Sequence, residues 1–130
     1  MSMNDPLANA LSHILNCERL GKNECKIQNA SKIIQKVLDI IKEDHYIGDY
    51  KIEDHGKGKI ITLNLIGGLN KCGAIKPRFS VNWNEFEKFE KRYLPAKGFG
   101  ILIVSTNKGI MTHTKALEKK LGGRLIAYCY

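Results

Sequence analysis

The chain has 130 residues, enough for one compact domain or for two small lobes that share an interface. With 43% hydrophobic and 26% charged residues and three prolines, its composition excludes a disordered chain. The formal net charge of +8 arises entirely from residues 67–130, because basic and acidic side chains balance over residues 1–66. Such asymmetry indicates a polyanionic partner, most commonly nucleic acid. The alternative is a solvated basic face that only aids solubility.

A helix is expected to begin at Asp5-Pro6, because Asp caps helices well and Pro fits the first turn. The helix is expected to end at Gly21. Its apolar positions recur at i, i+4, i+7 and i+8 and form one stripe. These positions are Leu7, Leu11, Ile14 and Leu15.

A short strand is expected over residues 24–28, followed by a second helix that starts at Ser31 and stops near Tyr46. The helix has a narrow apolar face made of Ile33, Ile34, Val37, Leu38 and Ile41. Apolar or aromatic residues stand at every second position over 50–52 and over 61–65, with a turn at 55–58 between them. This pattern predicts a hairpin. The N-terminal lobe, residues 1–66, is therefore expected to be α-β-α-β-β, with its helices on one face of a sheet.

Gly67-Gly68 marks the expected lobe boundary, where the charge also changes. Phe79, Val81 and Trp83 alternate with polar residues and predict a strand. Asn84 and Glu87 have the spacing of a capping box for a short helix that contains Phe86 and Phe89.

The apolar run 101–104 predicts a central, buried strand, followed by a polar turn over 105–109. A short basic helix over 114–121 ends at Gly122-Gly123, and residues 125–130 form the last strand. The fold class is α+β, and the C-terminal lobe, residues 67–130, is expected to be mostly antiparallel β with short helices.

Cysteines stand at positions Cys17, Cys25, Cys72 and Cys129, without the two- to four-residue separation typical of zinc ligands. We therefore expect no metal and no cofactor, and Cys17 and Cys25 to pack as small apolar residues. The sequence shows neither a secretory leader nor an apolar run of membrane-spanning length, so we expect reduced thiols, no membrane partner and a cytoplasmic location.

No sequence pattern predicts catalysis. Gly56-Lys57-Gly58 does not match a Walker loop and suits a hairpin turn, and Gly98-Phe99-Gly100 lacks the third glycine of a dinucleotide fingerprint. The histidines are scattered, and we expect each of them at the surface or in a turn; they are His13, His45, His55 and His113. An enzyme would have to use Cys72, which is better explained as a small residue packed beneath a loop.

The most informative segment is 104–112, in which a buried strand leads into Ser105-Thr106-Asn107-Lys108-Gly109. Small hydroxyl and amide side chains offer hydrogen bonds without bulk, so a nucleotide can approach the backbone closely. Specific RNA readers use the shallow minor groove or an irregular, unpaired core. An ordinary Asn-containing hairpin turn is the alternative for this segment.

The run Ser105–Met111 resembles the signature of the family of the eighth protein of the small ribosomal subunit. Supporting matches are Asp5-Pro6-Leu7-Ala8, Leu69-Asn70-Lys71-Cys72-Gly73, Ile75-Lys76-Pro77-Arg78-Phe79 and Gly122-Gly123. The resemblance covers essentially the whole chain. The matches over 69–73 and 75–79, called here the middle segment, and Asn107 are similar to the archaeal and eukaryotic branch, whereas bacterial members tend to have Ser at the position of Asn107.

The resemblance implies a primary binder of the central domain of small-subunit rRNA that touches neighbouring ribosomal proteins, is monomeric outside the ribosome, and in several members represses its own mRNA. It implies two α+β lobes. By position, Ser105, Thr106, Asn107 and Gly109 would contact an irregular RNA core, and Asn4, Asp5 and Pro6 a lower stem. Ser31 and Lys32 would contact phosphate at a helix N-terminus.

Our hypothesis divides the work of binding. The Ser105–Gly109 loop, with Ile110 and Met111 behind it, supplies specificity. Sequence-independent attraction comes from Lys71, Lys76, Arg78, Lys108, Lys115 and Arg124. A DNA-binding or general chaperoning protein remains the rival binding function, which competition between duplex DNA and a bulged RNA stem separates.

Overall fold

The structure is a computed structural model that describes residues 6–28, 31–54, 56, 58–75, 78–96 and 99–130. The chain forms two compact units, Met1–Lys71 and Cys72–Tyr130, called here the N-terminal and C-terminal units. The C-terminal unit holds eight Lys and three Arg against four Glu. Among the described residues, no helix has both the length and the apolar character needed to cross a membrane.

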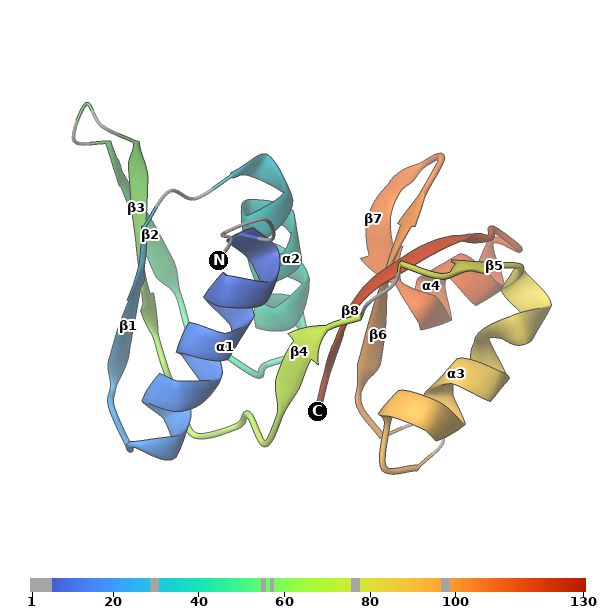
Figure 1. The fold of residues 1–130 in the computed structure, drawn as a ribbon, viewed down its shortest axis with the longest axis horizontal. Coiled ribbons are helices and arrows are strands. Elements are labelled where there is room, and N and C mark those ends of the chain that lie inside the picture. The colour runs from blue at the N-terminus through green and yellow to red at the C-terminus, as the bar shows by residue number, and fades with distance from the viewer. Residues whose placement is uncertain (1–5, 29–30, 55, 57, 76–77, 97–98) are drawn as a thin grey trace. The chain divides into compact units, whose positions relative to one another are not determined.

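The N-terminal unit has the predicted order α-β-α-β-β. Its three strands form an antiparallel sheet in the order β1-β3-β2, and both helices lie against the same face of that sheet (Figure 1). The elements are α1 (Pro6–Arg19), β1 (Glu24–Ile27), α2 (Lys32–Glu43), β2 (Tyr50–Asp54) and β3 (Lys59–Asn64). The expected cap Asp5 and the turn residues His55 and Lys57 lie outside the described residues.

The apolar stripes of the two helices form the core of this unit. The buried residues Leu7, Leu11 and Ile14 of α1 follow the predicted spacing. Ser31 caps α2, because its Oγ accepts a hydrogen bond of 3.4 Å from the Ile34 N–H. The second stripe buries Ile34, Val37, Leu38 and Ile41, and the sheet contributes buried residues that include Ile61 and Leu63.

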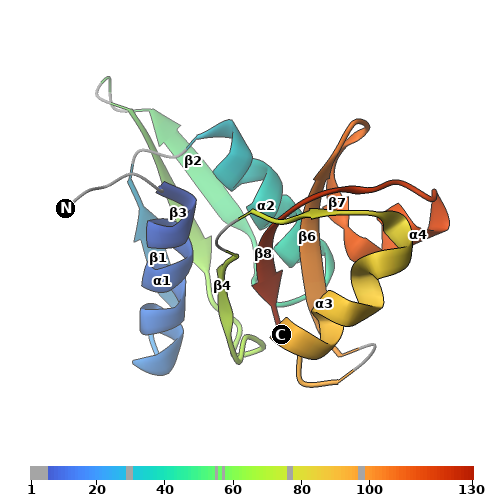
Figure 2. The ribbon, with the colours of Figure 1, turned by 45° about the vertical axis from the view of Figure 1, so that its right-hand side comes forward.

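The C-terminal unit is built on an antiparallel sheet in the order β4-β8-β6-β7, with β5 also paired to β8 (Figure 2). The strands are β4 (Cys72–Ala74), β5 (Ser80–Val81), β6 (Ile101–Thr106), β7 (Gly109–Thr112) and β8 (Gly123–Cys129). The helices are the 3-10 helix η1 (Trp83–Glu85), α3 (Phe86–Tyr93) and α4 (His113–Glu118). As predicted, β6 is an interior strand and residues 101–104 are all buried.

The strand expected over Phe79–Trp83 is wrong in length, because β5 contains only Ser80 and Val81. Val81 pairs with Gly123, the first residue of β8, so no partner strand continues beyond it. The chain therefore turns into η1, with the Asn82 N–H donating to Glu85 Oε1 at 3.0 Å. The capping box lies at Asn82 and Glu85, two residues before its predicted place.

Other boundaries in the C-terminal unit also differ from the prediction. Ser105 and Thr106 belong to β6 and Gly109 to β7, so the turn is only Asn107-Lys108. The helix expected over 114–121 covers His113–Glu118. It ends early because Lys120 takes a positive φ of 55° and the Leu121 N–H donates back to the Ala116 carbonyl. The last strand starts at Gly123 rather than Leu125.

Two of the four histidines are exposed as expected, His13 on α1 and His45 at the end of α2. The expectation for His113 is wrong, because this residue is only 2% exposed. His113 is buried because its ring accepts a hydrogen bond from the Leu102 backbone amide of β6.

Candidate nucleic-acid interface

The β6–β7 hairpin has a turn that is braced by one hydroxyl group. Thr106 Oγ1 donates to the Gly109 carbonyl at 2.8 Å and accepts from the Lys108 N–H at 3.1 Å. Gly109 takes a φ of +113°, a conformation that side chains other than glycine rarely adopt. The braced turn holds Asn107 and Lys108 exposed at its tip, which projects beyond β5 and β8 in both views (Figures 1 and 2).

Gly122 and Gly123 allow three stretches of backbone to approach one another closely. A Cβ on Gly123 would lie 2.1 Å from the Ser105 carbonyl oxygen, and a Cβ on Gly122 would lie 2.6 Å from the Val81 carbonyl oxygen. Real Cβ atoms essentially never come this close to backbone. The glycine pair therefore lets β8 begin tightly between β5 and β6.

A pocket of about 510 Å³ opens where these segments meet. Polar groups from β6, from the turn between β5 and η1, and from the start of β8 converge on it. Its lining residues are Ser80, Val81, Asn82, Glu85, Ser105, Thr106, Asn107, Gly122, Gly123 and Arg124. Hydroxyl, amide, carboxylate and guanidinium groups together offer both donors and acceptors to a ligand.

The strand register places Arg124 between two serines. Arg124 of β8 pairs with Ser105 of β6 on one side and with Ser80 of β5 on the other, and all three residues are exposed. Directly opposed residues on antiparallel strands point to the same face. A fixed positive charge therefore stands between two small hydroxyls in the lining of the pocket, an arrangement that suits a phosphate or a base edge.

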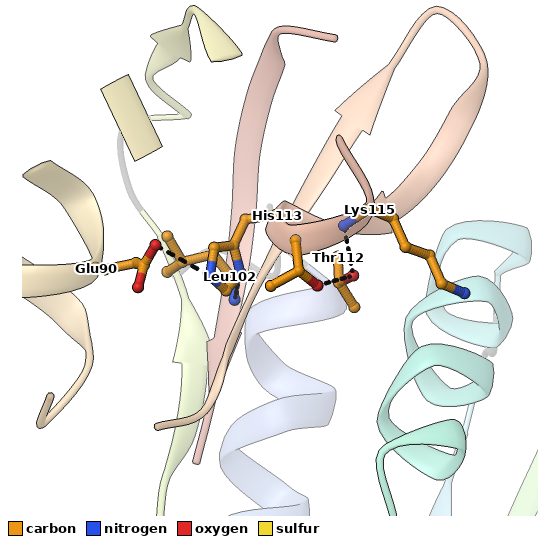
Figure 3. A network of polar contacts seen from close by, with 6 residues as sticks. Glu90, Leu102, Thr112, His113 and Lys115 are labelled. Carbon is orange, nitrogen blue, oxygen red and sulfur yellow. Dashed lines mark hydrogen bonds and ion pairs between the residues drawn. The ribbon is translucent and has the colours of Figure 1, made fainter. Parts of the chain in front are cut away.

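Buried polar contacts support the hairpin at its base (Figure 3). Thr112, the last residue of β7, pairs with Ile103 of β6. The amide of Leu102, the residue before Ile103, therefore lies outside the part of β6 that is paired with β7. The Leu102 N–H donates to His113 Nδ1 at 3.0 Å, and His113 Nε2 lies 3.3 Å from Glu90 Oε1. His113 thus takes the place of a strand residue and ties β6 to α3.

The junction between β7 and α4 is also fixed. Thr112 Oγ1 accepts from the Lys115 N–H at 3.4 Å and lies 3.0 Å from Thr114 Oγ1 (Figure 3). Thr112 is the N-cap of α4, which follows β7 without a loop. Both ends of β7 are therefore held, one by the Thr106 hydroxyl and the other by this cap.

The profile of one protein family, described as Ribosomal protein S8, matches residues 5–130. The chain belongs to the ribosomal protein S8 family. S8 proteins are structural components of the small ribosomal subunit that bind rRNA, and they work in the cytoplasmic ribosome. The S8 family is not an enzyme family, which removes the enzyme hypothesis for Cys72.

The structure brings together some of the residues predicted to bind RNA. Ser105, Thr106, Asn107 and Arg124 line one pocket, and Lys108 stands beside it at the hairpin tip. Within the signature that resembles S8, Ile110 is half-buried and Met111 lies in the core, so the Met111 side chain serves packing.

The other predicted residues lie elsewhere or outside the described residues. Arg78 is exposed in the C-terminal unit. Pro6, Ser31, Lys32 and Lys71 belong to the N-terminal unit, Ser31 half-buried at its cap and the others exposed. Asn4, Asp5 and Lys76 are not among the described residues.

Sequence reasoning missed several residues that line the pocket. The sequence alone places Ser80, Asn82 and Glu85 in a strand and a helix start and indicates a helix end at Gly122-Gly123, whereas all five residues line the pocket. A glycine pair just before an apolar strand was the available signal, because adjacent glycines inside a sheet often mark a close backbone approach. Which strands approach one another at this glycine pair depends on the register of the sheet, and a local sequence pattern does not give that register.

Proposed function

We propose that the pocket, with Arg124 between Ser105 and Ser80 in its lining, recognises an irregular helix in the central domain of small-subunit rRNA. The chain would then be a primary binder that helps the subunit assemble. The observation that carries this proposal is the convergence of Ser105, Thr106, Asn107 and Arg124 on one pocket of about 510 Å³. Unpaired bases expose hydrogen-bonding edges that a regular RNA helix hides, and small polar side chains can read them.

Within the pocket the proposed roles differ. The Thr106 hydroxyl is engaged in the turn, so Thr106 acts mainly by shaping the loop. Asn107, exposed at the tip, offers its amide group to RNA, and Ser105 offers a hydroxyl next to Arg124. Gly109 and Ile110 contribute backbone groups, and Met111 contributes packing alone.

Electrostatic attraction is proposed to come from surrounding basic residues and to carry little sequence information. In the C-terminal unit these are Lys76, Arg78, Lys108, Lys115 and Arg124. The N-terminal unit would add lower-stem and phosphate contacts through Asn4, Asp5, Pro6, Ser31, Lys32 and Lys71. If about five phosphates are neutralised, the log–log dependence of affinity on salt has a slope of roughly −3.5 to −4.5.

We further propose that residues 67–130 are the principal RNA-binding lobe and residues 1–66 a supporting lobe. Support comes from the charge excess in the C-terminal half.

The middle segment and Asn107 favour assignment of the chain to the archaeal and eukaryotic branch of the family. A protein that binds an irregular rRNA helix would also bind an mRNA segment of the same structure. On this basis we propose that the protein represses translation of its own mRNA. Free of the ribosome, the chain is proposed to be monomeric.

Footprinting of the protein on small-subunit rRNA tests this function. We expect protection confined to an irregular helix of the central domain, and weakened protection with Asn107→Ala. Lys108→Ala is the matched comparison at the same turn. It should make the slope of log affinity against log salt concentration less steep by roughly 0.7–0.9, the contribution of one neutralised phosphate. Protection spread evenly over helical rRNA would contradict the proposal.

A further inference from the structure

Three metal-binding side chains come together in the N-terminal unit, none of which lines the polar pocket. His13 and Cys17 are one helical turn apart on α1, and Cys25 lies on the neighbouring strand β1. One ligand atom from each of the three residues lies within 4.8 Å of the other two. Cys17 Sγ and His13 Nε2 are 3.9 Å apart. We propose that His13, Cys17 and Cys25 form a zinc site that links α1 to β1.

The donor set fits zinc. Thiolate sulfur and imidazole nitrogen are the ligands that Zn²⁺ uses most in proteins. Bonds of about 2.0 Å to nitrogen and 2.3 Å to sulfur, at tetrahedral angles, place ligand atoms about 3.5–3.8 Å apart. The observed 3.9 Å between Cys17 Sγ and His13 Nε2 is close to this spacing. All three ligand atoms lie within 4.8 Å of one another, so the distances between them have to shorten by about 1 Å at most when zinc binds. Rotation of the exposed His13 side chain can supply part of that movement.

The burial pattern gives the site an inner and an outer side. Cys17 is 4% and Cys25 is 2% exposed, whereas His13 is exposed. The sulfurs therefore face the core and the imidazole closes the site from the solvent side, where water can complete a four-coordinate shell. Binding converts two thiols to thiolates and releases two protons to solvent, so affinity rises with pH.

The site also has a structural consequence, because β1 is an edge strand. It pairs only with β3 in the described sheet, with Cys25 opposite Leu63. A metal bound across Cys17 and Cys25 ties this edge to the helix that covers it. Because the unfolded chain does not hold the three ligands together, zinc binding favours the folded state.

The separation of ligands explains why sequence patterns did not reveal this site. Cys17 and Cys25 are eight positions apart, outside the short spacing of zinc-finger pairs. The i, i+4 pair of His13 and Cys17 was the signal, since residues at this spacing share a helix face. The antiparallel return of the chain through Gly21 then brings Cys25 beside them.

Cobalt binding to the full chain, kept reduced, tests the proposal. We expect one equivalent of Co²⁺ to give tetrahedral d–d bands and a sulfur-to-cobalt charge-transfer band, both abolished by one equivalent of Zn²⁺. Cys17→Ala and Cys25→Ala should each lower the charge-transfer intensity. His13→Ala, an exposed change that should leave the fold intact by circular dichroism, should weaken metal binding by more than about 10- to 100-fold, because the loss of a ligand's hydrogen-bond partner alone costs that much.

Matched controls are available in the same chain. Cys72 is as buried as Cys17, at 4%, and His45 is an exposed histidine at the end of α2, so Cys72→Ala and His45→Asn should leave the cobalt spectrum unchanged. The proposal is overturned if no charge-transfer band appears at one equivalent. It is also overturned if the band survives in the Cys17→Ala, Cys25→Ala double variant, or if His13→Ala binds metal as tightly as the unaltered chain.

Discussion

His113 and Glu90 form a buried polar pair, with His113 Nε2 3.3 Å from a carboxylate oxygen of Glu90. The other ring nitrogen, Nδ1, accepts from the Leu102 N–H, so the ring proton must lie on Nε2 and point to Glu90. The pair joins α3 to the end of the β6–β7 hairpin. It therefore holds the base of the element whose tip is proposed to read RNA.

Removing the carboxylate should destabilise the C-terminal unit. Glu90→Ala removes the carboxylate that lies 3.3 Å from the buried His113 Nε2, at a cost of about 1–3 kcal/mol in the free energy of unfolding. Glu90→Gln keeps an acceptor oxygen and should cost less. Urea denaturation of the two variants measures the difference. Equal losses would show that the carboxylate charge, rather than the hydrogen bond, is what His113 requires.

Gly123→Ala should be more damaging than Gly109→Ala. The added Cβ at Gly123 would meet the Ser105 carbonyl at 2.1 Å, which forces β6 and β8 apart, whereas the Cβ at Gly109 meets nothing within 4 Å. Gly109→Ala therefore carries only backbone strain, about 1–3 kcal/mol, and Gly123→Ala adds the separation of two strands. Thermal unfolding of both variants gives the ranking. A Gly123→Ala protein as stable as Gly109→Ala would contradict the close approach.

The Thr106 hydroxyl should matter more for the hairpin turn than for a direct RNA contact. Thr106→Ser keeps the hydroxyl that bonds Gly109 and Lys108, and Thr106→Val keeps the shape without it. Thr106→Val should lose about 1–3 kcal/mol of RNA-binding free energy, and Thr106→Ser much less. Filter binding at fixed salt makes the comparison. Its control is amide hydrogen exchange at Lys108, which should speed up in the valine variant alone.

Tyr50 and Asp39 should make stability depend on alkaline pH. Burial, then the hydrogen bond from the Tyr50 hydroxyl to Asp39 and the charge of that carboxylate, raises the pKa of Tyr50 from 10.0 to about 12. The folded state thus holds the phenolic proton more tightly than the unfolded state does. The resulting stabilisation is complete below pH 10 and is lost as the pH rises from 10 to about 12.

Comparison with Tyr50→Phe measures this effect. The difference in free energy of unfolding between the two proteins should be constant below pH 10 and shrink above it. Spectrophotometric titration of Asp39→Asn should show the Tyr50 pKa moving back toward 10.0 without reaching it, since burial is the largest cause. A difference that grows above pH 10 would contradict the assigned contact.

Local patterns predicted the elements well where one face of an element is buried. The stripe Leu7, Leu11 and Ile14 identified α1, and the apolar run 101–104 identified the central strand. Strand ends were missed because they depend on partners: β5 stops at Val81 because β8 starts at Gly123. No property of residues 79–83 by themselves carries that information.

The candidate site was predictable only in part, for a similar reason. Hydroxyl and amide side chains in sequence pointed to 105–107, but the pocket needs Asn82 and Gly122 from distant segments. His113 was expected at the surface, since its burial depends on where β7 ends relative to Leu102. Residues that act through tertiary partners leave little trace in local composition.

The most direct test of the proposed recognition is a paired binding measurement. The protein is titrated with the irregular central-domain rRNA helix and with the same helix made fully complementary, across a range of salt concentrations. We expect the irregular helix to bind more tightly at physiological salt, with Asn107→Ala reducing that preference while the salt slope stays nearly unchanged. Equal affinity for both helices, or an Asn107→Ala protein that changes only the slope, would contradict recognition through the pocket.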